Sequence, residues 1–216
     1  MKLIDSTFSD LRSSEGAFDL LNNFKNIETL DEISKRLQKK YTDVLNSYRK
    51  ELEIYKNLFI SGKKAYEEGN DSLVISRGKP PIAGIISWAK SLIQRMKTPI
   101  VKFHKNEDKF EKEQYEEVKS EYLTLVKEID HYQQQKYVQW SSNIMDRAMM
   151  FLKEKILIKT DENKYVVNFK EDFKILIQEA KQLEKMNHNI SKAIVNIALQ
   201  EKEYYRYIDK LKTMLR

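Results

Sequence analysis

Apolar residues recur from Leu30 to Phe59 at intervals of three, four and four residues, and this spacing restricts the possible folds most strongly. The eleven-residue repeat corresponds to about 3.67 residues per helical turn, so these side chains stay on one side of a nearly straight helix. We therefore predict one long helix from about residue 28 to residue 68. The stripe consists of Leu30, Ile33, Leu37, Tyr41, Val44, Tyr48, Leu52, Tyr55 and Phe59.

The remaining sequence is also typical of helices, with one exception. Its 216 residues include only five glycines and three prolines, whereas 33% are charged and 41% are hydrophobic. Folds rich in strands need more turn residues. Apolar stripes mark residues 82–96 and a second long helix near Tyr115, whose spacing slips at 133–136 and predicts a stutter or a bend. In residues 155–169, two β-branched runs flank a polar turn and predict a β-hairpin. The predicted fold class is all-α: elongated helical bundles of long antiparallel helices with one small β-hairpin.

Glycines and prolines interrupt the chain at residues 67–81, and we place a division there. Gly69, Gly78 and the pair Pro80-Pro81 should end the first long helix. Pro81 fits the first turn of the next helix, where its missing N–H has no cost. The predicted parts are an N-terminal helical segment, 1–75, and a helical bundle with the hairpin, 76–216, both within one continuous structure.

Two further predictions concern helix ends. Pro99 lacks the N–H that an interior helix position needs, so the helix should stop or bend near Thr98. Asn168 should cap the helix after the hairpin, with Glu171 in the reciprocal position of a capping box.

The positive charges are unevenly distributed. The formal net charge is +6, and no acidic residue lies between Asp71 and Glu107, where seven basic residues stand. These charges repel one another unless acidic groups come near, from elsewhere in the chain or from a partner. A solvated helix surface is the alternative explanation. Ile85, Ala89, Leu92 and Met96 should turn inward, and we predict partner contacts at Arg77, Lys79, Lys90, Arg95 and Lys97.

The sequence lacks the patterns that catalysis and cofactor binding require. Neither Gly62-Lys63 nor Gly78-Lys79 stands in a phosphate-binding loop, and no G-x-G-x-x-G occurs. There is no cysteine, and the three histidines lie far apart without ligand spacing. No run approaches the ~20 apolar residues of a membrane span, and the first residues do not resemble a secretory signal. We predict no catalytic residue, no cofactor and no bound metal.

Three stretches together resemble the N-terminal tail (stem) region of dynein heavy chains. They are KPPIAGIISWAKSLIQRM at 79–96, KYVVNFKEDFKILIQEAKQLEKMNHNIS at 164–191, and the long helix before the double proline; the likeness covers roughly residues 17–215. Lys170 and Ser191 depart from the family pattern, which commonly has Asp and Pro there. The positions that carry the resemblance are Pro80, Pro81, Gly84, Trp88, Trp140, Asn168 and Phe169.

The resemblance implies a non-catalytic scaffold within a microtubule motor. In the family the ATP-hydrolysing ring lies far downstream, so these residues would form a tail segment and not an enzyme. The implied partners are a dynein intermediate chain with a WD-repeat propeller, adjacent heavy chains and light chains, with no nucleic acid and no membrane. Pro99 and the Ala83-Gly84 pair look more like axonemal, outer-arm-like chains than the cytoplasmic form, which implies the cytoskeleton of the cilium.

Two other functions stay open from the residues alone. One is a stand-alone helical adaptor without a motor. The other is a basic module that binds nucleic acid or an anionic membrane, although its basic residues are not interleaved with aromatics and glycines as in RNA-binding modules. Salt-dependent binding of RNA or liposomes, without preference for a propeller, would favour the second.

We expect the chain to turn over no nucleotide, because it has no phosphate-binding loop, no cysteine and no cluster of histidines. Phosphate release from ATP measures this. Turnover that a point substitution within these residues abolishes would contradict the prediction.

Overall fold

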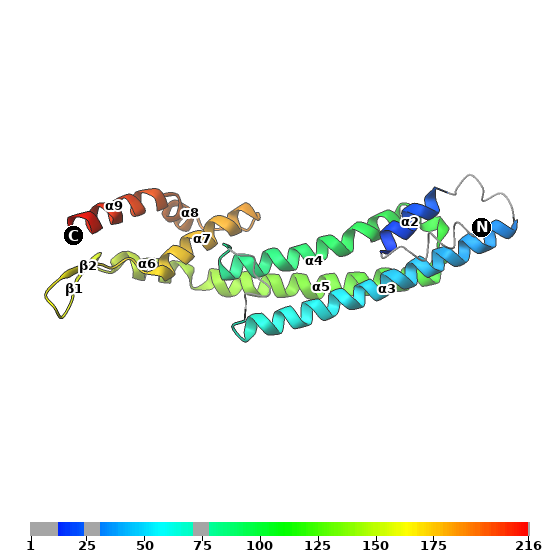
Figure 1. The fold of residues 1–216 in the computed structure, drawn as a ribbon, viewed down its shortest axis with the longest axis horizontal. Coiled ribbons are helices and arrows are strands. Elements are labelled where there is room, and N and C mark those ends of the chain that lie inside the picture. The colour runs from blue at the N-terminus through cyan, green and yellow to red at the C-terminus, as the bar shows by residue number, and fades with distance from the viewer. Residues whose placement is uncertain (1–12, 24–30, 71–77, 216) are drawn as a thin grey trace. The chain divides into compact units, whose positions relative to one another are not determined.

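The computed structural model describes residues 13–23, 31–70 and 78–215, most of them in helices. The predicted all-α class with one small hairpin is confirmed. In chain order the elements are α2 (Ser14–Asn22), α3 (Asp31–Glu67), α4 (Pro81–His104), a 3-10 turn (Glu107–Lys109), α5 (Lys112–Ser142), α6 (Ile144–Lys153), β1 (Leu157–Lys159), β2 (Tyr165–Val167), α7 (Glu171–Lys185), α8 (Lys192–Leu199) and α9 (Glu201–Met214) (Figure 1).

The chain divides into two compact units that share two helices. Unit 1 contains Met1–Gly69 and Ala89–His131, and unit 2 contains Asn70–Trp88 and Tyr132–Arg216. Helices α4 and α5 therefore contribute residues to both units. The predicted division after residue 75 separates two successive stretches of sequence, whereas each compact unit combines segments from different parts of the chain. The predicted division therefore stays a prediction.

Helix α3 carries the predicted apolar stripe into the core of unit 1. The phenol of Tyr48 donates a hydrogen bond to the carbonyl of Met96 at 2.7 Å, and its ring lies 5.4 Å from that of Phe103. The predicted packing of the stripe on the helix that begins after the double proline is therefore confirmed at Met96. Tyr55 is only half-buried, and the side chains of Leu30 and Ile33 lie outside the described residues. The buried positions are Leu37, Tyr41, Val44, Leu45, Tyr48, Leu52 and Phe59.

Helix α2 packs on α3, which also caps it. The N–H and the hydroxyl of Ser14 donate to the two carboxylate oxygens of Glu51 at 2.6 and 3.0 Å. The ring of Phe18 lies 5.1 Å from Phe103 and 5.7 Å from Phe110. An aromatic cluster thus joins α2 to the C-terminal part of α4 within unit 1.

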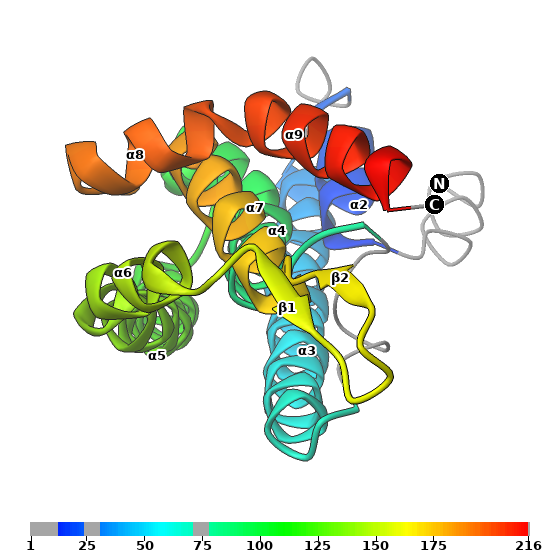
Figure 2. The ribbon, with the colours of Figure 1, turned by 90° about the vertical axis from the view of Figure 1, so that its left-hand side faces the viewer.

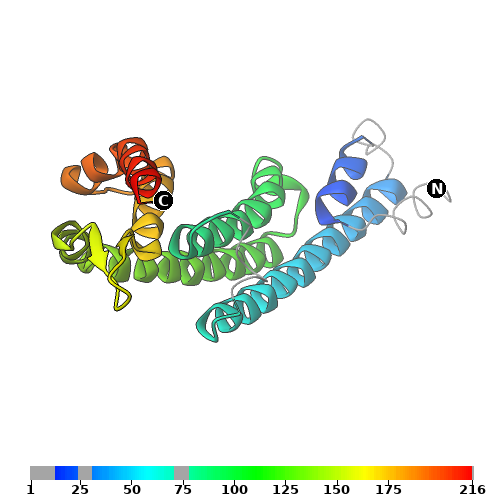
Figure 3. The same ribbon diagram turned by 60° about the vertical axis from the view of Figure 1, so that its left-hand side comes forward.

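Helix α4 continues through Pro99 to His104, so it does not stop near Thr98, whereas a bend of the helix there stays a prediction. Pro99, Ile100 and Phe103 are buried in unit 1. Their burial offsets the cost of a proline inside a helix, which is about 3 kcal/mol and comes from the lost backbone hydrogen bond together with the steric clash of the ring. A short connection joins the end of α4 to the start of α5 (Figure 3), and His104 Nδ1 lies 3.2 Å from the hydroxyl of Tyr115, its hydrogen-bond partner on α5.

Helix α5 is continuous through residues 133–136, where the apolar spacing slips. The buried positions change there from Ile129 and Tyr132 to Gln133 and Trp140, which is the phase shift of a stutter. The change coincides with the passage of α5 from unit 1 to unit 2.

The hairpin is confirmed, and its register pairs Leu157 with Val167 and Lys159 with Tyr165. Within the polar turn, Asn163 has φ of 63°, a left-handed conformation that asparagine tolerates well.

The predicted capping box after the hairpin is wrong. Helix α7 begins at Glu171, and its N-cap residue is Lys170, whose side chain makes no capping hydrogen bond. The amide of Asn168 instead donates back to the carbonyl of Lys155 at 3.0 Å, because the hairpin places residue 155 beside it.

Replacing Leu52 by Asp should lower the free energy of unfolding by about 3–5 kcal/mol, because an unpaired charge would be buried in the core of unit 1. Leu52 is 4% exposed, whereas Ile54 on the same helix is 58% exposed. Ile54→Asp is therefore the matched control and should change the free energy by less than about 0.5 kcal/mol. Urea unfolding measures both free energies. Equal unfolding midpoints for the two variants would contradict the prediction that Leu52 contributes to the core.

Candidate functional site

A carboxylate from another helix of unit 2 completes the first turn of α4. Such a turn has N–H groups without partners inside the helix. In the pair Pro80-Pro81 the second proline has no N–H, and the next two N–H groups, of Ile82 and Ala83, donate to Oε1 and Oε2 of Glu179 at 2.7 Å each. The N–H of Gly84 donates to the carbonyl of the first proline at 2.8 Å and begins the helical ladder. Every donor of this turn therefore has a partner.

Glu179 is 2% exposed, although it carries an ionisable group. Helix α4 has no acidic residue in its own first turn, so Glu179 supplies the negative charge that the helix dipole favours there. Burial raises the pKa of Glu179 to about 7, against the opposing effects of the two backbone N–H groups and of Arg147. The carboxyl that links α4 to α7 therefore has its pKa near neutral pH.

The other motif residues of α4 and α5 in unit 2 are mostly buried. Pro80, Gly84 and Trp140 are buried, and Trp88 is half-buried. The ring of Trp140 lies 6.4 Å from that of Tyr137. These residues belong to the packing of unit 2.

Asn168 and Phe169 connect the hairpin to the helices that follow it. Besides its bond to the hairpin backbone, the amide of Asn168 donates to Oε2 of Glu154 at 3.3 Å. The ring of Phe169 lies 5.6 Å from Phe173 on α7 and 5.9 Å from Tyr205 on α9. Both residues thus hold the hairpin in unit 2.

Three of the predicted partner-binding residues lie on the exposed half of α4, with Lys90 and Lys97 at one edge and Arg95 at the other. Lys90, Arg95 and Lys97 are exposed, and the four residues predicted to turn inward are buried. At about 100° per residue, Lys97 lies about 20° from Lys90 around the helix axis, and Arg95 about 140° away. Gln94 and Thr98 lie between them and are also exposed. We call this surface, defined by Lys90, Arg95 and Lys97, the basic face of α4.

The other two predicted residues do not belong to this face. Lys79 is exposed in unit 2, where its ammonium group donates to the hydroxyl of Ser87 at 2.6 Å. Arg77 lies outside the described residues.

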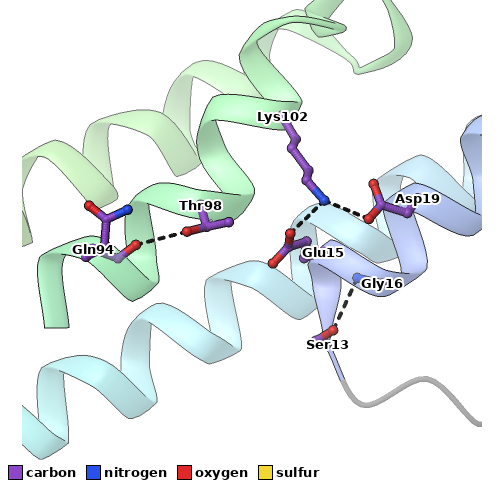
Figure 4. A network of polar contacts seen from close by, with 7 residues as sticks. All are labelled: Ser13, Glu15, Gly16, Asp19, Gln94, Thr98 and Lys102. Atoms are coloured by element: carbon purple, nitrogen blue, oxygen red, sulfur yellow. Dashed lines mark hydrogen bonds and ion pairs between the residues drawn. The ribbon is translucent and has the colours of Figure 1, made fainter. Parts of the chain in front are cut away.

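Part of the basic stretch is neutralised within the chain. Figure 4 shows Lys102 of α4 reaching α2, where its ammonium group lies 2.6 Å from a carboxylate oxygen of Glu15 and 2.7 Å from one of Asp19. Hydrogen bonds to Asp19 and Glu15 raise the pKa of Lys102. Acidic neighbours are expected for this basic stretch, and Lys102 has them in Glu15 and Asp19 of unit 1.

The part of the chain that the structure describes contains neither a cluster of metal-ligating side chains nor a membrane-spanning helix. Within residues 13–23, 31–70 and 78–215, no three His, Asp or Glu side chains gather closely enough to hold a metal ion. None of the helices described in these ranges combines the length and the apolar character needed to cross a bilayer.

Glu179 is the residue that sequence analysis missed. It lies on the buried stripe of α7, between Leu176 and Leu183, where the other buried side chains are apolar. A charged residue in an apolar stripe indicates a specific partner, because an unpaired buried charge is costly. The sequence therefore contained a signal for Glu179. It did not identify the partner, because backbone N–H groups leave no pattern in a sequence.

The whole chain matches the family described as "Dynein heavy chain, N-terminal region 1", over residues 1–216. It is 31% identical to the dynein-1-alpha heavy chain of the flagellar inner arm I1 complex from Chlamydomonas reinhardtii, over 99% of this chain and 4% of that protein. It is 25% identical to the gamma chain of the flagellar outer arm from the same organism, over 99% of this chain and 5% of that protein. Human dynein axonemal heavy chain 10 is 27% identical over 70% of this chain and 4% of its own length.

Replacing Glu179 by Gln should change how stability depends on pH. The folded-state pKa of about 7 lies above the ordinary 4.5, so the folded chain holds this proton more tightly than the unfolded chain. The resulting stabilisation is fully present below the ordinary pKa and is lost as the pH rises through the folded pKa. Relative to Glu179→Gln, the free energy of unfolding of the unsubstituted chain should fall by on the order of 3 kcal/mol across this range.

Urea unfolding at a series of pH values between the two pKa values measures this effect. Glu184→Gln is the matched control, because Glu184 is an exposed glutamate on the same helix. Its pH profile should follow that of the unsubstituted chain. A parallel profile for Glu179→Gln would show that Glu179 titrates in the folded chain as it does in the unfolded one.

Proposed function

This chain belongs to the family of dynein heavy chain N-terminal regions, and from that premise we propose that it is a non-catalytic scaffold in the tail of a dynein motor. It spans about 4% of the length of its curated relatives. The proposed task of this piece is to hold other subunits, while the chemistry of the motor takes place elsewhere in the complex.

The basic face of α4 is the observation that carries the proposal. Lys90, Arg95 and Lys97 project from a helix whose opposite side is buried, so the helix itself is held firmly in the core of unit 1. No acidic residue occurs in the sequence between Asp71 and Glu107. A fixed surface of one charge sign attracts a surface of the other sign and sets the rate of encounter.

We assign this face to an acidic surface on another dynein subunit. The first candidate is the WD-repeat propeller of an intermediate chain, and adjacent heavy chains and light chains come next. The names of the relatives place them in flagellar inner and outer arms, so the proposed location is the axoneme of a cilium or flagellum. Binding of nucleic acid or of an anionic membrane by the same face is the competing outcome.

Reversing Lys90 and Arg95 to Glu should slow association with an intermediate chain and weaken its dependence on ionic strength, because charges at an interface rim act mainly on the encounter. The free energy of unfolding should change by no more than about 1 kcal/mol, since both side chains are exposed. Surface plasmon resonance at several salt concentrations measures the association rate.

The control double variant is Lys39→Glu with Lys127→Glu, which makes the same change in net charge at exposed positions of α3 and α5. It should leave the association rate within about twofold of the unsubstituted chain, since exposed charges outside the interface are largely screened. If the Lys90 and Arg95 variant associates at an unchanged rate at low salt, the basic face is a solvated surface and does not bind the intermediate chain. Loss of RNA or liposome binding in that variant alone would support the competing outcome.

A further inference from the structure

Unit 2 contains an open apolar groove of about 290 Å³. Helix α6, the hairpin, α7 and α9 surround it; these elements face the viewer in Figure 2. We call it the α6–α9 groove, and its main lining residues are Phe151, Leu152, Phe169, Phe173, Tyr204 and Tyr207.

The floor of the α6–α9 groove is a set of packed aromatic rings. The ring of Phe173 lies 5.5 Å from Phe151, 5.6 Å from Phe169 and 5.7 Å from Tyr204. Phe173 itself is buried. The floor therefore belongs to the core of unit 2 and is held in shape without an occupant.

The walls of the groove, by contrast, expose large apolar side chains. Leu152 is 44% exposed, Ile156 59% and Tyr207 58%. Met214 follows Tyr207 by seven residues, or two turns, and so extends the same side of α9. An exposed apolar patch of this kind, continuous with a groove, marks a binding surface.

The size of the groove suits side chains of a polypeptide. A cavity of about 150 Å³ accommodates benzene, so the α6–α9 groove has room for about two large apolar side chains. Side chains three or four residues apart on a helix lie next to each other and can enter one groove together. The strands β1 and β2 have three residues each, which offers little edge for an added strand.

Lysines stand next to lining residues in the sequence at two places, and the carboxylate of the lining residue Glu203 is paired with Arg206 at 3.7 Å. Lys153 and Lys155 alternate with the lining residues Leu152, Glu154 and Ile156 on α6 and the hairpin. Lys210 and Lys212 stand on either side of the lining residue 211 on α9. All four lysines are exposed, and within the described residues none of them forms an ion pair. By contrast, Lys170 inside the groove is paired with Glu154 at 2.5 Å.

We propose that the α6–α9 groove binds an amphipathic helix of another protein, with two large apolar side chains one turn apart and acidic residues beside them. The acidic residues would meet the flanking lysines, and the apolar pair would fill the groove. A second copy of this chain fits less well, because pairing the same faces would bring lysines against lysines. The proposal rests on the scaffold function above but uses unit 2, whereas the basic face of α4 lies in unit 1.

Selection of helical peptides tests the proposal without prior choice of a partner. A phage-displayed library of helical peptides with randomised apolar and charged positions is panned on the 216-residue chain and counter-selected on the Leu152→Asp variant. Peptides with two large apolar residues at i and i+3 or i+4, flanked by Asp or Glu, should be enriched. Enrichment of basic or uncharged flanks, or no enrichment over the counter-selection, would overturn the proposal.

Binding of a synthetic version of the enriched peptide is then measured by fluorescence anisotropy. Leu152→Asp and Tyr207→Asp should each weaken binding at least tenfold, and Lys155→Glu with Lys210→Glu should weaken it several-fold. The matched controls are Leu199→Asp, at a 70% exposed apolar position outside the groove, and Lys202→Glu, on the opposite side of α9; both should bind normally. Circular dichroism confirms that every variant folds.

Two further results separate this proposal from its alternatives. Sedimentation equilibrium that shows a dimer, abolished by Leu152→Asp, would assign the groove to a second copy and overturn the proposal. Normal peptide binding by the Lys90 and Arg95 double variant is expected. If that variant also binds the intermediate chain normally, the proposed function of the basic face fails while the groove proposal stands.

Discussion

One buried carboxylate, that of Glu179, fixes where α4 begins and how α7 lies against it. An apolar stripe alone allows two helices to slide by a turn with little loss of buried area, whereas directed hydrogen bonds at 2.7 Å to Ile82 and Ala83 allow one position only. Glu51 performs a similar task in unit 1, where it accepts two hydrogen bonds from Ser14 at the start of α2. In each unit, a glutamate on one helix thus completes the N-terminus of another, and we infer that these pairs define the register of the bundles.

The fold could be predicted from the sequence wherever one period or one turn motif dominates. The stripe on α3 and the β-branched runs of the hairpin are of this kind, and both are found where expected. The errors share a cause: local rules for Pro99 and Asn168 ignored what the folded chain offers. Burial in unit 1 keeps the helix intact at Pro99, and the hairpin provides Asn168 with the carbonyl of Lys155. The role of Glu179 depends on two backbone groups almost a hundred residues away, which no local pattern reveals.

Some charges of the chain join helices within a unit, and others lie on exposed helix faces. Lys102 lies between Glu15 and Asp19, and Arg49 of α3 pairs with Glu117 and Glu121 of α5 at 3.0 Å each. These pairs join helices within unit 1 and reduce the positive charge of its surface locally. Lys90, Arg95 and Lys97 of the basic face take no part in these pairs. Because Lys102 is neutralised by Glu15 and Asp19, fewer than the seven basic residues of this stretch contribute to its positive surface.

The hydrogen bond between Ile82 and Glu179 joins residues 97 positions apart, which has a consequence for the order of events during synthesis. A ribosome adds about 5–20 residues per second, so the first turn of α4 leaves it roughly 5–20 s before its carboxylate partner. The last residue of unit 1, His131, leaves the ribosome before Glu179 does, so the partners of the C-terminal part of α4 are synthesised first. The N–H groups at the start of α4 meet their carboxylate partner only after α7 emerges.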